Sequence, residues 1–266
     1  MGSFNKEYIS LMELSYEKMQ KYDGLTSLNI STLTMVCDMK IDINLEKLTK
    51  NFQGPSYPLC FIKKAKTNKD VTYTKRGKPK KSFYNQTTIT VSDLTNKSVK
   101  VFKNGKLQIT GLTSHNDFIN TINIIKTILL NTPDSVNHDD ITDKPIEPKI
   151  EMINSNFNFS KELNLKKMRL IMLENKNIKA ASYNPDTYPG INAKYNDTSL
   201  FVFGTGNVVI TGAKSIQEVR TAYEFVSEVV CSNKDTHIRN GIGKKPPKNP
   251  IIYRNGYPES AYIACK

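Results

Sequence analysis

The chain has 266 residues, of which 38% are hydrophobic and 24% are charged, and its formal net charge is +13 at pH 7. This length is enough to bury a full core as one large domain or two small ones. The composition is that of an ordinary soluble protein and excludes a wholly disordered or membrane-embedded one. The excess positive charge favours a polyanionic partner, with nucleic acid ahead of an anionic membrane surface.

The N-terminal residues contain no apolar secretion signal, so we expect an intracellular protein. Four scattered cysteines have no CxxC spacing and no histidine beside them, which favours reduced thiols over a disulfide framework or a zinc site. The three histidines lie far apart and form no nucleophile–base pattern. We therefore expect no metal, no cofactor and no enzymatic activity.

In the first half of the chain, a helix at 4–22 gathers apolar residues largely on one side and ends at Gly24. A segment dense in lysine and punctuated by proline and glycine, residues 54–81, is interpreted as a basic insertion that the second half lacks, either without regular structure or with a small hairpin of its own. The other elements expected in this half are a strand at 28–36, a helix at 42–52, strands at 85–92, 97–103 and 106–111, and a helix at 115–130.

The second half follows an acidic linker at 132–147 and repeats this order, without the N-terminal helix and the insertion. Its elements are a strand at 149–158, a helix at 161–174, strands at 190–195, 198–203 and 207–211, and a helix at 215–230. The predicted organisation is an N-terminal helical extension (1–24), a first repeat (25–131), a linker (132–147), a second repeat (148–231) and a basic C-terminal tail (232–266), which we expect to be poorly packed.

Two segments of the chain carry the same pattern of residues. Phe102, Gly105 and Thr110 recur as Phe203, Gly206 and Thr211 at a constant interval of 101 positions. This interval is too long for a solenoid repeat and suits a duplicated half-domain. Each half has the order β-α-β-β-β-α, which predicts an α+β fold with an antiparallel sheet and helices on one face.

The strands at 198–203 and 207–211 are apolar on both faces. One set of side chains packs on the helices, whereas Phe201, Phe203 and Val209 point to the other face. A second sheet or subunit covering that face is the ordinary explanation, but the sequence has no spare strands for it. In a strongly basic chain, such a face suits the DNA minor groove, where shape and aromatic wedges dominate recognition.

These residues resemble the TATA-box-binding protein family. The resemblance rests on Tyr183-Asn-Pro-Asp-Thr-Tyr-Pro-Gly190 and on Leu200-Phe-Val-Phe-Gly-Thr-Gly-Asn-Val-Val-Ile-Thr-Gly-Ala-Lys-Ser215, and covers roughly residues 25–231. It implies two pseudo-symmetric repeats that form a curved, saddle-shaped sheet with helices on the convex face. It also implies a monomeric transcription initiation factor that binds and bends AT-rich promoter DNA. The Asn-, Lys- and Ile-rich composition suggests a giant-virus or protist version, located in the nucleus, a viral factory or a virion.

The resemblance assigns DNA wedges to Phe102, Tyr188 and Phe203. Phe83 fits the fourth wedge by hairpin length, and Tyr84 and Tyr57 are alternatives. The family's central asparagines map to Asn29 and, in the second repeat, to Met152, with Asn154 two residues on. The expected minor-groove face consists of Asn29, Ser31, Gln108, Thr110, Asn154, Phe201, Val209 and Thr211.

Lysines beside the proposed wedges are expected to contact phosphates and to position the protein without specifying sequence. They are Lys80, Lys81, Lys103, Lys106 and Lys194. Asp186 is expected to contact a TFIIB-like initiation factor, and RNA polymerase machinery is implied as a further partner.

There are two rival interpretations, and only the second stays open. A similar domain occurs beside some DNA glycosylases and RNases H, but 266 residues filled by two repeats leave no room for a catalytic domain. The other is a repurposed scaffold that binds protein partners with little or no DNA bending. The polar residues Lys100 and Gln108 in the first repeat keep this second reading alive.

Overall fold

The computed structural model describes residues 2–56, 58–63, 85–93, 95–137, 139, 141, 146–233, 236, 253–254 and 257–258. The chain divides into two compact units. The first-repeat unit contains residues 34–150, and the second-repeat unit contains residues 1–33 and 151–266.

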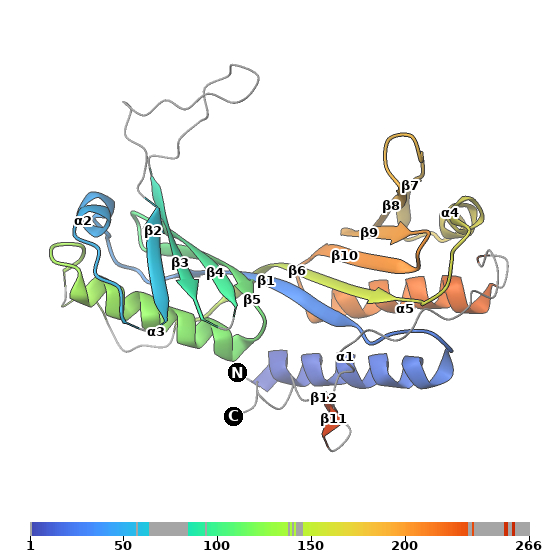
Figure 1. Ribbon diagram of the computed structural model, residues 1–266, viewed down its shortest axis with the longest axis horizontal. Helices are drawn as coiled ribbons and strands as arrows, with labels where there is room; N and C mark the ends of the chain where they lie inside the picture. Colours follow the sequence, from blue (N-terminus) through green and yellow to red (C-terminus); the bar gives the residue numbers. More distant parts are fainter. Residues whose placement is uncertain are drawn as a thin grey trace. The chain divides into compact units, whose positions relative to one another are not determined.

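The described residues form five helices and twelve strands (Figure 1). The helices are α1 (Gly2–Lys21), α2 (Leu45–Lys50), α3 (His115–Asn131), α4 (Leu165–Leu173) and α5 (Ile216–Ser232). The strands are β1 (Asn29–Asp38), β2 (Leu59–Lys63), β3 (Gln86–Ser92), β4 (Asn96–Phe102), β5 (Lys106–Leu112), β6 (Lys149–Asn158), β7 (Ile178–Ser182), β8 (Gly190–Tyr195), β9 (Thr198–Phe203), β10 (Asn207–Ala213), β11 (Tyr253–Arg254) and β12 (Tyr257–Pro258).

Hydrogen bonds join ten strands in the order β2-β3-β4-β5-β1-β6-β10-β9-β8-β7, whereas β11 pairs with β12 alone. The boundary between the units falls inside β1 and inside β6. None of the helices in the described part of the chain combines the length and the apolar character that a membrane crossing requires.

The duplication predicted from the 101-residue interval is confirmed by strand register. In the first-repeat unit, β4 pairs with β5 so that Ser98 faces Thr110. In the second-repeat unit, Ser199 faces Thr211 in the equivalent pair of β9 and β10. The other three residue pairs of each hairpin correspond at the same interval. The predicted α+β class, with two repeats of one topology, is therefore correct.

Each repeat contains one strand more than the sequence predicted. Strand β2 lies inside the segment 54–81, so residues 59–63 are an edge strand paired with β3 and are not part of an insertion. Strand β7 is its counterpart beside β8. The order of each repeat is therefore β-α-β-β-β-β-α. Residues 64–84 lie outside the described residues.

In the second-repeat unit, the helices pack on one face of the sheet. Leu200, Val202, Val208 and Ile210 are fully buried on this face, and both α4 and α5 contact the sheet. The ring of Tyr223 on α5 is also buried and packs edge-on against a phenylalanine of β6. The inward half of the strand alternation therefore forms the core.

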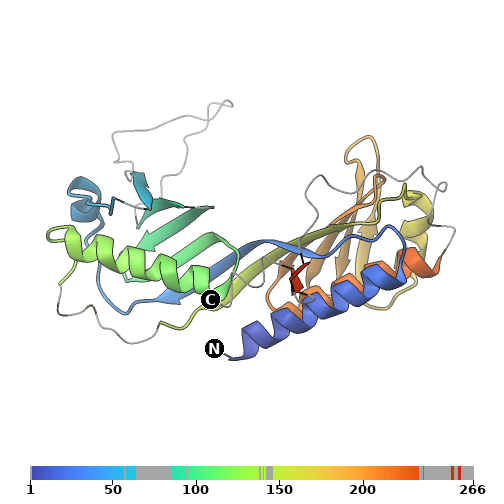
Figure 2. The same cartoon turned by 60° about the horizontal axis from the view of Figure 1, so that its bottom comes forward.

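Helix α1 was expected as an addition before the first repeat, and the structure packs it on α5 of the second-repeat unit (Figure 2). Leu11 is fully buried, and the Ser15 hydroxyl accepts a hydrogen bond of 2.8 Å from the backbone N–H of Leu28. Arg220 of α5 donates to the hydroxyl of Ser10 at 2.8 Å. These contacts make α1 part of the fold of this unit.

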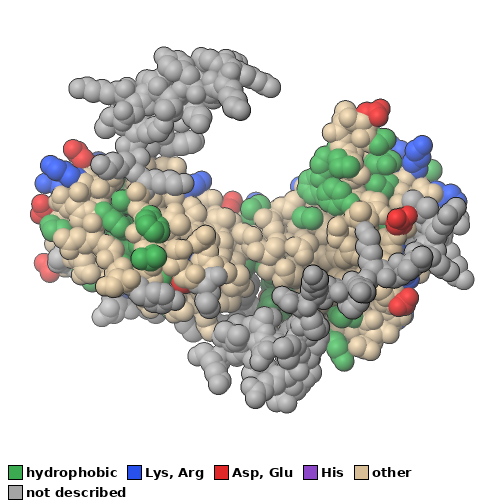
Figure 3. Space-filling view, viewed as in Figure 1, with side chains coloured by type: hydrophobic (Ala, Val, Ile, Leu, Met, Phe, Trp, Pro, Cys, Tyr) green, Lys and Arg blue, Asp and Glu red, His purple; other side chains and the backbone are tan. Residues whose placement is uncertain are grey.

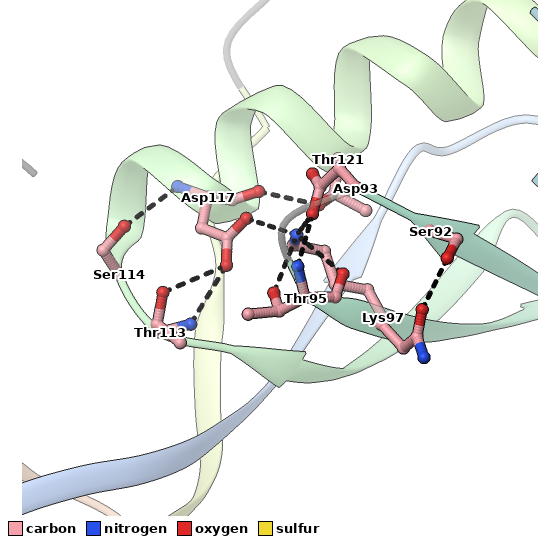
Figure 4. Close-up of polar contacts among 9 residues, drawn as sticks. Ser92, Asp93, Thr95, Lys97, Thr113, Ser114, Asp117 and Thr121 are labelled. Carbon is pink, nitrogen blue, oxygen red and sulfur yellow. Dashed lines mark hydrogen bonds and ion pairs between the residues drawn. The ribbon is translucent and has the colours of Figure 1, made fainter. Parts of the chain in front are cut away.

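In the first-repeat unit, a buried lysine connects the β3–β4 turn to the start of α3 (Figure 4). The Nζ of Lys97 lies 2.7 Å from Asp93 Oδ1 and 2.9 Å from Asp117 Oδ1. Asp117 also accepts hydrogen bonds from Thr113, and Ser114 caps the helix. Only 2% of the Lys97 side chain is exposed, so the two carboxylates neutralise its charge inside the protein.

Candidate nucleic-acid interface

The face of each sheet opposite the helices is called the open face. In the second-repeat unit, strand alternation places Phe201 and Phe203 there, and both are half-buried. Strand pairing places Val209 opposite Phe201 and Thr211 opposite Ser199, on the same face. The predicted apolar open face of the second repeat is therefore present in the structure.

Three aromatic side chains, Tyr188, Phe201 and Phe203, form an aromatic cluster at this face. The centroid of the Tyr188 ring lies 5.9 Å from that of Phe201 and 5.9 Å from that of Phe203. Figure 3 shows hydrophobic side chains gathered beside the loop between β7 and β8. Tyr188 is 38% exposed, so the cluster is accessible to a ligand.

Gly190 allows the Phe203 ring to lie close to β8. A Cβ atom at Gly190 would lie 3.0 Å from the Phe203 ring and 2.8 Å from the carbonyl oxygen of Val202. A side chain at this position would therefore displace the ring. The equivalent partner of Phe102 in the first-repeat unit is Gln86, so the two repeats differ beneath this aromatic.

Polar side chains continue the open face of the second-repeat unit toward β6. The Thr211 hydroxyl donates to Asn154 Oδ1 and lies 4.0 Å from the Met152 sulfur. The Ser31 hydroxyl donates to the carbonyl oxygen of Asn154 at 3.2 Å. Asn29 is exposed in the same unit. The structure therefore brings Ser31, Asn154 and Thr211 together, as the predicted set requires.

The open face of the first-repeat unit is more polar. Lys100 pairs with Gln108 across β4 and β5, and Phe102 is half-buried at the end of β4. The Thr34 hydroxyl donates to that of Thr110 at 3.3 Å. Thr34 was not singled out from sequence. The sequence did contain one indication of its role. Thr110 matches Thr211, and the partner of Thr211, Asn154, was already predicted to lie on the minor-groove face, so Thr110 was expected to have a similar partner.

Strand β2 adds two apolar side chains that the sequence analysis missed. Leu59 and Phe61 are 56% and 58% exposed. They pair with Ser92 and Thr90 of β3 and therefore lie on one face of the sheet. Their alternate spacing was visible in the sequence, but the segment was read as an insertion.

The repeat alignment that matched Asn29 with Met152 is wrong. After β1, the backbone N–H groups of Met39 and Ile43 donate to the carbonyl oxygens of Gly105 and Lys103. After β6, Phe159 and Leu163 donate to Gly206 and Gly204 in the same way, with the donors 120 positions later and the acceptors 101 positions later. Lys40 and Ser160, also 120 positions apart, share positive φ angles of 56° and 49°. By this interval, Met152 corresponds to Thr32.

Asn154 accordingly corresponds to Thr34, and Asn29 to Lys149. The error arose because Asn29-Ile30 resembles the family pattern locally. Asn29 stays a predicted groove contact on the basis of its exposure.

The described lysines near the proposed wedges differ in their surroundings. Lys103 and Lys106 are exposed in and after the turn that follows Phe102. Lys194 instead donates to the carbonyl oxygen of Asp197 and to the Ser199 hydroxyl, so its ammonium is held by the adjacent turn. The predicted residues Lys80, Lys81 and Phe83, and the alternatives Tyr84 and Tyr57, lie outside the described residues.

Asp186 lies in the loop between β7 and β8, which local hydrogen bonds order. Its backbone N–H donates to Asn184 Oδ1 at 3.1 Å, and that of Tyr188 donates to the Asn184 carbonyl at 2.9 Å. The Asp186 side chain is exposed. The loop therefore presents Asp186 and Tyr188 from one fixed turn.

Comparisons with known proteins agree with this fold. The family model described as transcription factor TFIID, or TATA-binding protein, matches residues 147–232. A TATA-box-binding protein-like protein of Acanthamoeba polyphaga mimivirus is 31% identical over 260 residues, which cover 85% of this chain and 71% of that protein. A TATA-box-binding protein of Pyrobaculum aerophilum is 29% identical over 48% of this chain, and the match spans 59% of that relative.

A solved structure, Methanococcus jannaschii TBP, has the same fold with a TM-score of 0.56. The superposition covers 78% of this chain and all of that one, at 18% sequence identity.

Proposed function

Because this chain belongs to the TATA-box-binding protein family, a family of transcription factors, we propose that it binds AT-rich duplex DNA through the minor groove and bends it. The observation that carries the proposal is the aromatic cluster of Tyr188, Phe201 and Phe203 on an open sheet face. Apolar wedges of this kind unstack base steps and kink the duplex.

The polar part of the open face suits the same ligand. The minor groove of A·T pairs offers mainly acceptors, so hydroxyl and amide donors with a small footprint fit it. The Thr110 hydroxyl, which accepts from Thr34, can donate to such acceptors, and so can the amide N–H₂ of Asn154, whose Oδ1 accepts from Thr211. Lys103 and Lys106 would add sequence-independent contacts with phosphates.

Strand register favours Tyr84 over Phe83 as the fourth wedge. Tyr188 precedes Gly190 by two positions, and Gly190 pairs with Phe203. In the first-repeat unit Gln86 pairs with Phe102, and the residue two positions before Gln86 is Tyr84. We therefore propose Tyr84, Phe102, Tyr188 and Phe203 as wedges. A 2-aminopurine base placed at the kink fluoresces more strongly when a wedge unstacks it. In the DNA complex, this fluorescence should be lost with Tyr84→Ala and kept with Phe83→Ala.

In a cell, the proposed factor acts in transcription initiation, in the nucleus or in a viral factory, with a TFIIB-like factor and RNA polymerase as partners. The exposed loop that carries Asp186 supports the first of these partners. The alternative is a scaffold that binds proteins with little DNA bending, and the polar open face of the first-repeat unit favours it.

A binding assay on two duplexes of equal length tests the proposal. Fluorescence anisotropy should give tighter binding to an AT-rich duplex than to a GC-rich one. Affinity should fall with salt for both duplexes, because phosphate contacts release counterions. Phe203→Ala should speed dissociation more than it slows association. Equal affinity for the two duplexes at every salt concentration would reject minor-groove recognition and favour the scaffold.

A further inference from the structure

Helix α4 is fixed on the second-repeat unit by its inner face. Met168 and Met172 are fully buried, and Leu165 is 6% exposed. The Arg169 Nε donates to the carbonyl oxygen of Ala181 in β7 at 2.9 Å, which ties the helix to the neighbouring strand (Figure 1). These contacts hold the outer face of α4 as a rigid surface.

The outer face of α4 exposes two leucines. Leu170 is 58% exposed and Leu173 is 43% exposed. Residues three apart lie on the same side of a helix, so the two side chains form one apolar patch. Lys166 lies four positions before Leu170 and is also exposed. Helix α4 contains three basic residues and no acidic one.

The first repeat provides an internal comparison. Asn164 caps α4 through the N–H of Lys167, and Asn44 caps α2 through the N–H of Lys47, 120 positions earlier. By this correspondence the buried Met168 matches the buried Leu48. The exposed Leu170 matches Lys50, the last residue of α2. Leu173 has no helical counterpart, because α2 ends three residues before the matching position, Gln53. The fold therefore accepts a polar residue at the position of Leu170, and the exposure of both leucines places them outside the core.

We propose that the outer face of α4 is a docking site for an acidic amphipathic segment of a protein partner. The apolar side of such a segment covers Leu170 and Leu173, and its carboxylates face Lys166. The charge of α4 selects this occupant. The chain's own C-terminal tail carries Lys244, Lys245 and Lys248 and would be repelled by the same charge. This inference concerns a helix face and does not depend on the proposed DNA binding.

The test is a selection of peptides against the full chain. A displayed library of random 16-residue peptides is panned on the protein and then counter-selected on a Leu170→Lys/Leu173→Gln variant, in which both outer positions are polar. We expect enrichment of peptides with helically spaced apolar residues and net negative charge. A patch of this size should give dissociation constants on the order of 10–100 µM. The double substitution should weaken binding at least tenfold.

Two controls make the result specific. Thermal unfolding of the variant should match that of the unsubstituted protein, because both changed side chains are exposed. Lys166→Glu should weaken the selected peptides and remove most of the salt dependence of their binding. A library that yields no binders, basic binders, or binders that the variant retains would overturn the proposal. Tight binding of the AT-rich duplex that is lost in the same variant would instead assign the leucines to DNA.

Discussion

Removal of the buried ammonium of Lys97 should destabilise the first-repeat unit strongly. Lys97→Met keeps most of the buried side chain but removes the ammonium that lies 2.7 Å from Asp93 Oδ1 and 2.9 Å from Asp117 Oδ1. Both carboxylates then lose their common partner. At the equivalent position of the second-repeat unit stands Thr198, also 2% exposed, and there Glu218 only caps the helix through Lys214. The buried charge is therefore a device of the first repeat alone.

The magnitude follows from burial. Breaking a buried ion pair by removing one partner costs about 3–5 kcal/mol. Here the two carboxylates are 25% and 16% exposed, so water can solvate them in part after the substitution. We therefore expect a loss of about 2–3 kcal/mol, which lowers the melting temperature of a unit of this size by about 8–12 °C.

The assay is urea unfolding at pH 7 with a matched control. Lys47 pairs with Asp134 at 3.5 Å, and these side chains are 47% and 72% exposed. Lys47→Met should therefore cost at most about 1 kcal/mol. If Lys97→Met costs no more than Lys47→Met, the buried cluster does not stabilise the unit and the reasoning fails.

The same cluster predicts a pH dependence. Burial alone would raise the pKa of Asp93, but the hydrogen bond from Lys97, backbone hydrogen bonds and the Lys97 charge together outweigh it and lower that pKa. A lowered carboxyl pKa contributes stability that is present above the unfolded-state value, about 3.9, and is lost as the pH falls. Burial likewise opposes the charge of Lys97, yet its bonds to Asp93 and Asp117 raise its pKa. The difference between the protein and Lys97→Met should therefore shrink below about pH 4.

Three further predictions concern single features of the chain. Gly206→Ala should lower the melting temperature far more than Gly212→Ala. Both glycines have a positive φ, but of the two only Gly206 would place a Cβ against the backbone, 2.6 Å from the Lys161 carbonyl oxygen. Equal losses of stability would contradict this clash. Deletion of residues 64–81 should flatten the salt dependence of DNA affinity and keep sequence preference; an unchanged slope would exclude phosphate contacts there. Asp186→Arg should weaken a ternary complex with a TFIIB-like factor in a gel-shift assay and spare binary DNA binding; equal loss of both would show a role in the fold.

The sequence predicted the repeated hairpin–helix units well. A repeated residue pattern such as Phe102 to Ser114 and Phe203 to Ser215 carries strand register directly, because each matched residue must occupy the same face in both copies. All four residue pairs of the two central hairpins confirm this. The caps of α3 and α5 were likewise readable from Ser114 and Ser215.

The edge strands could not be predicted in the same way. Strand β7 reads Ile-Lys-Ala-Ala-Ser, which has little β-propensity and no clear alternation, so tertiary pairing with β8 decides its structure. The contact between α1 and α5 was equally hidden, because the two helices are about two hundred positions apart in sequence and their apolar sides match only in three dimensions. The alignment of the two first strands could not be taken from the 101-residue interval, because the chain from Ile43 to Lys103 is 19 residues longer than the chain from Leu163 to Gly204.

The measurement that tests the central claim most directly is the bend angle of an AT-rich duplex, obtained from fluorescence transfer between dyes at its two ends. Binding should shorten the distance between the ends, and a Phe102→Ala/Phe203→Ala variant should bind with the ends far apart, because each wedge offsets a few kcal/mol of unstacking. The proposal would be contradicted by a duplex that stays straight when saturated with the protein, or by a bend that the double variant retains.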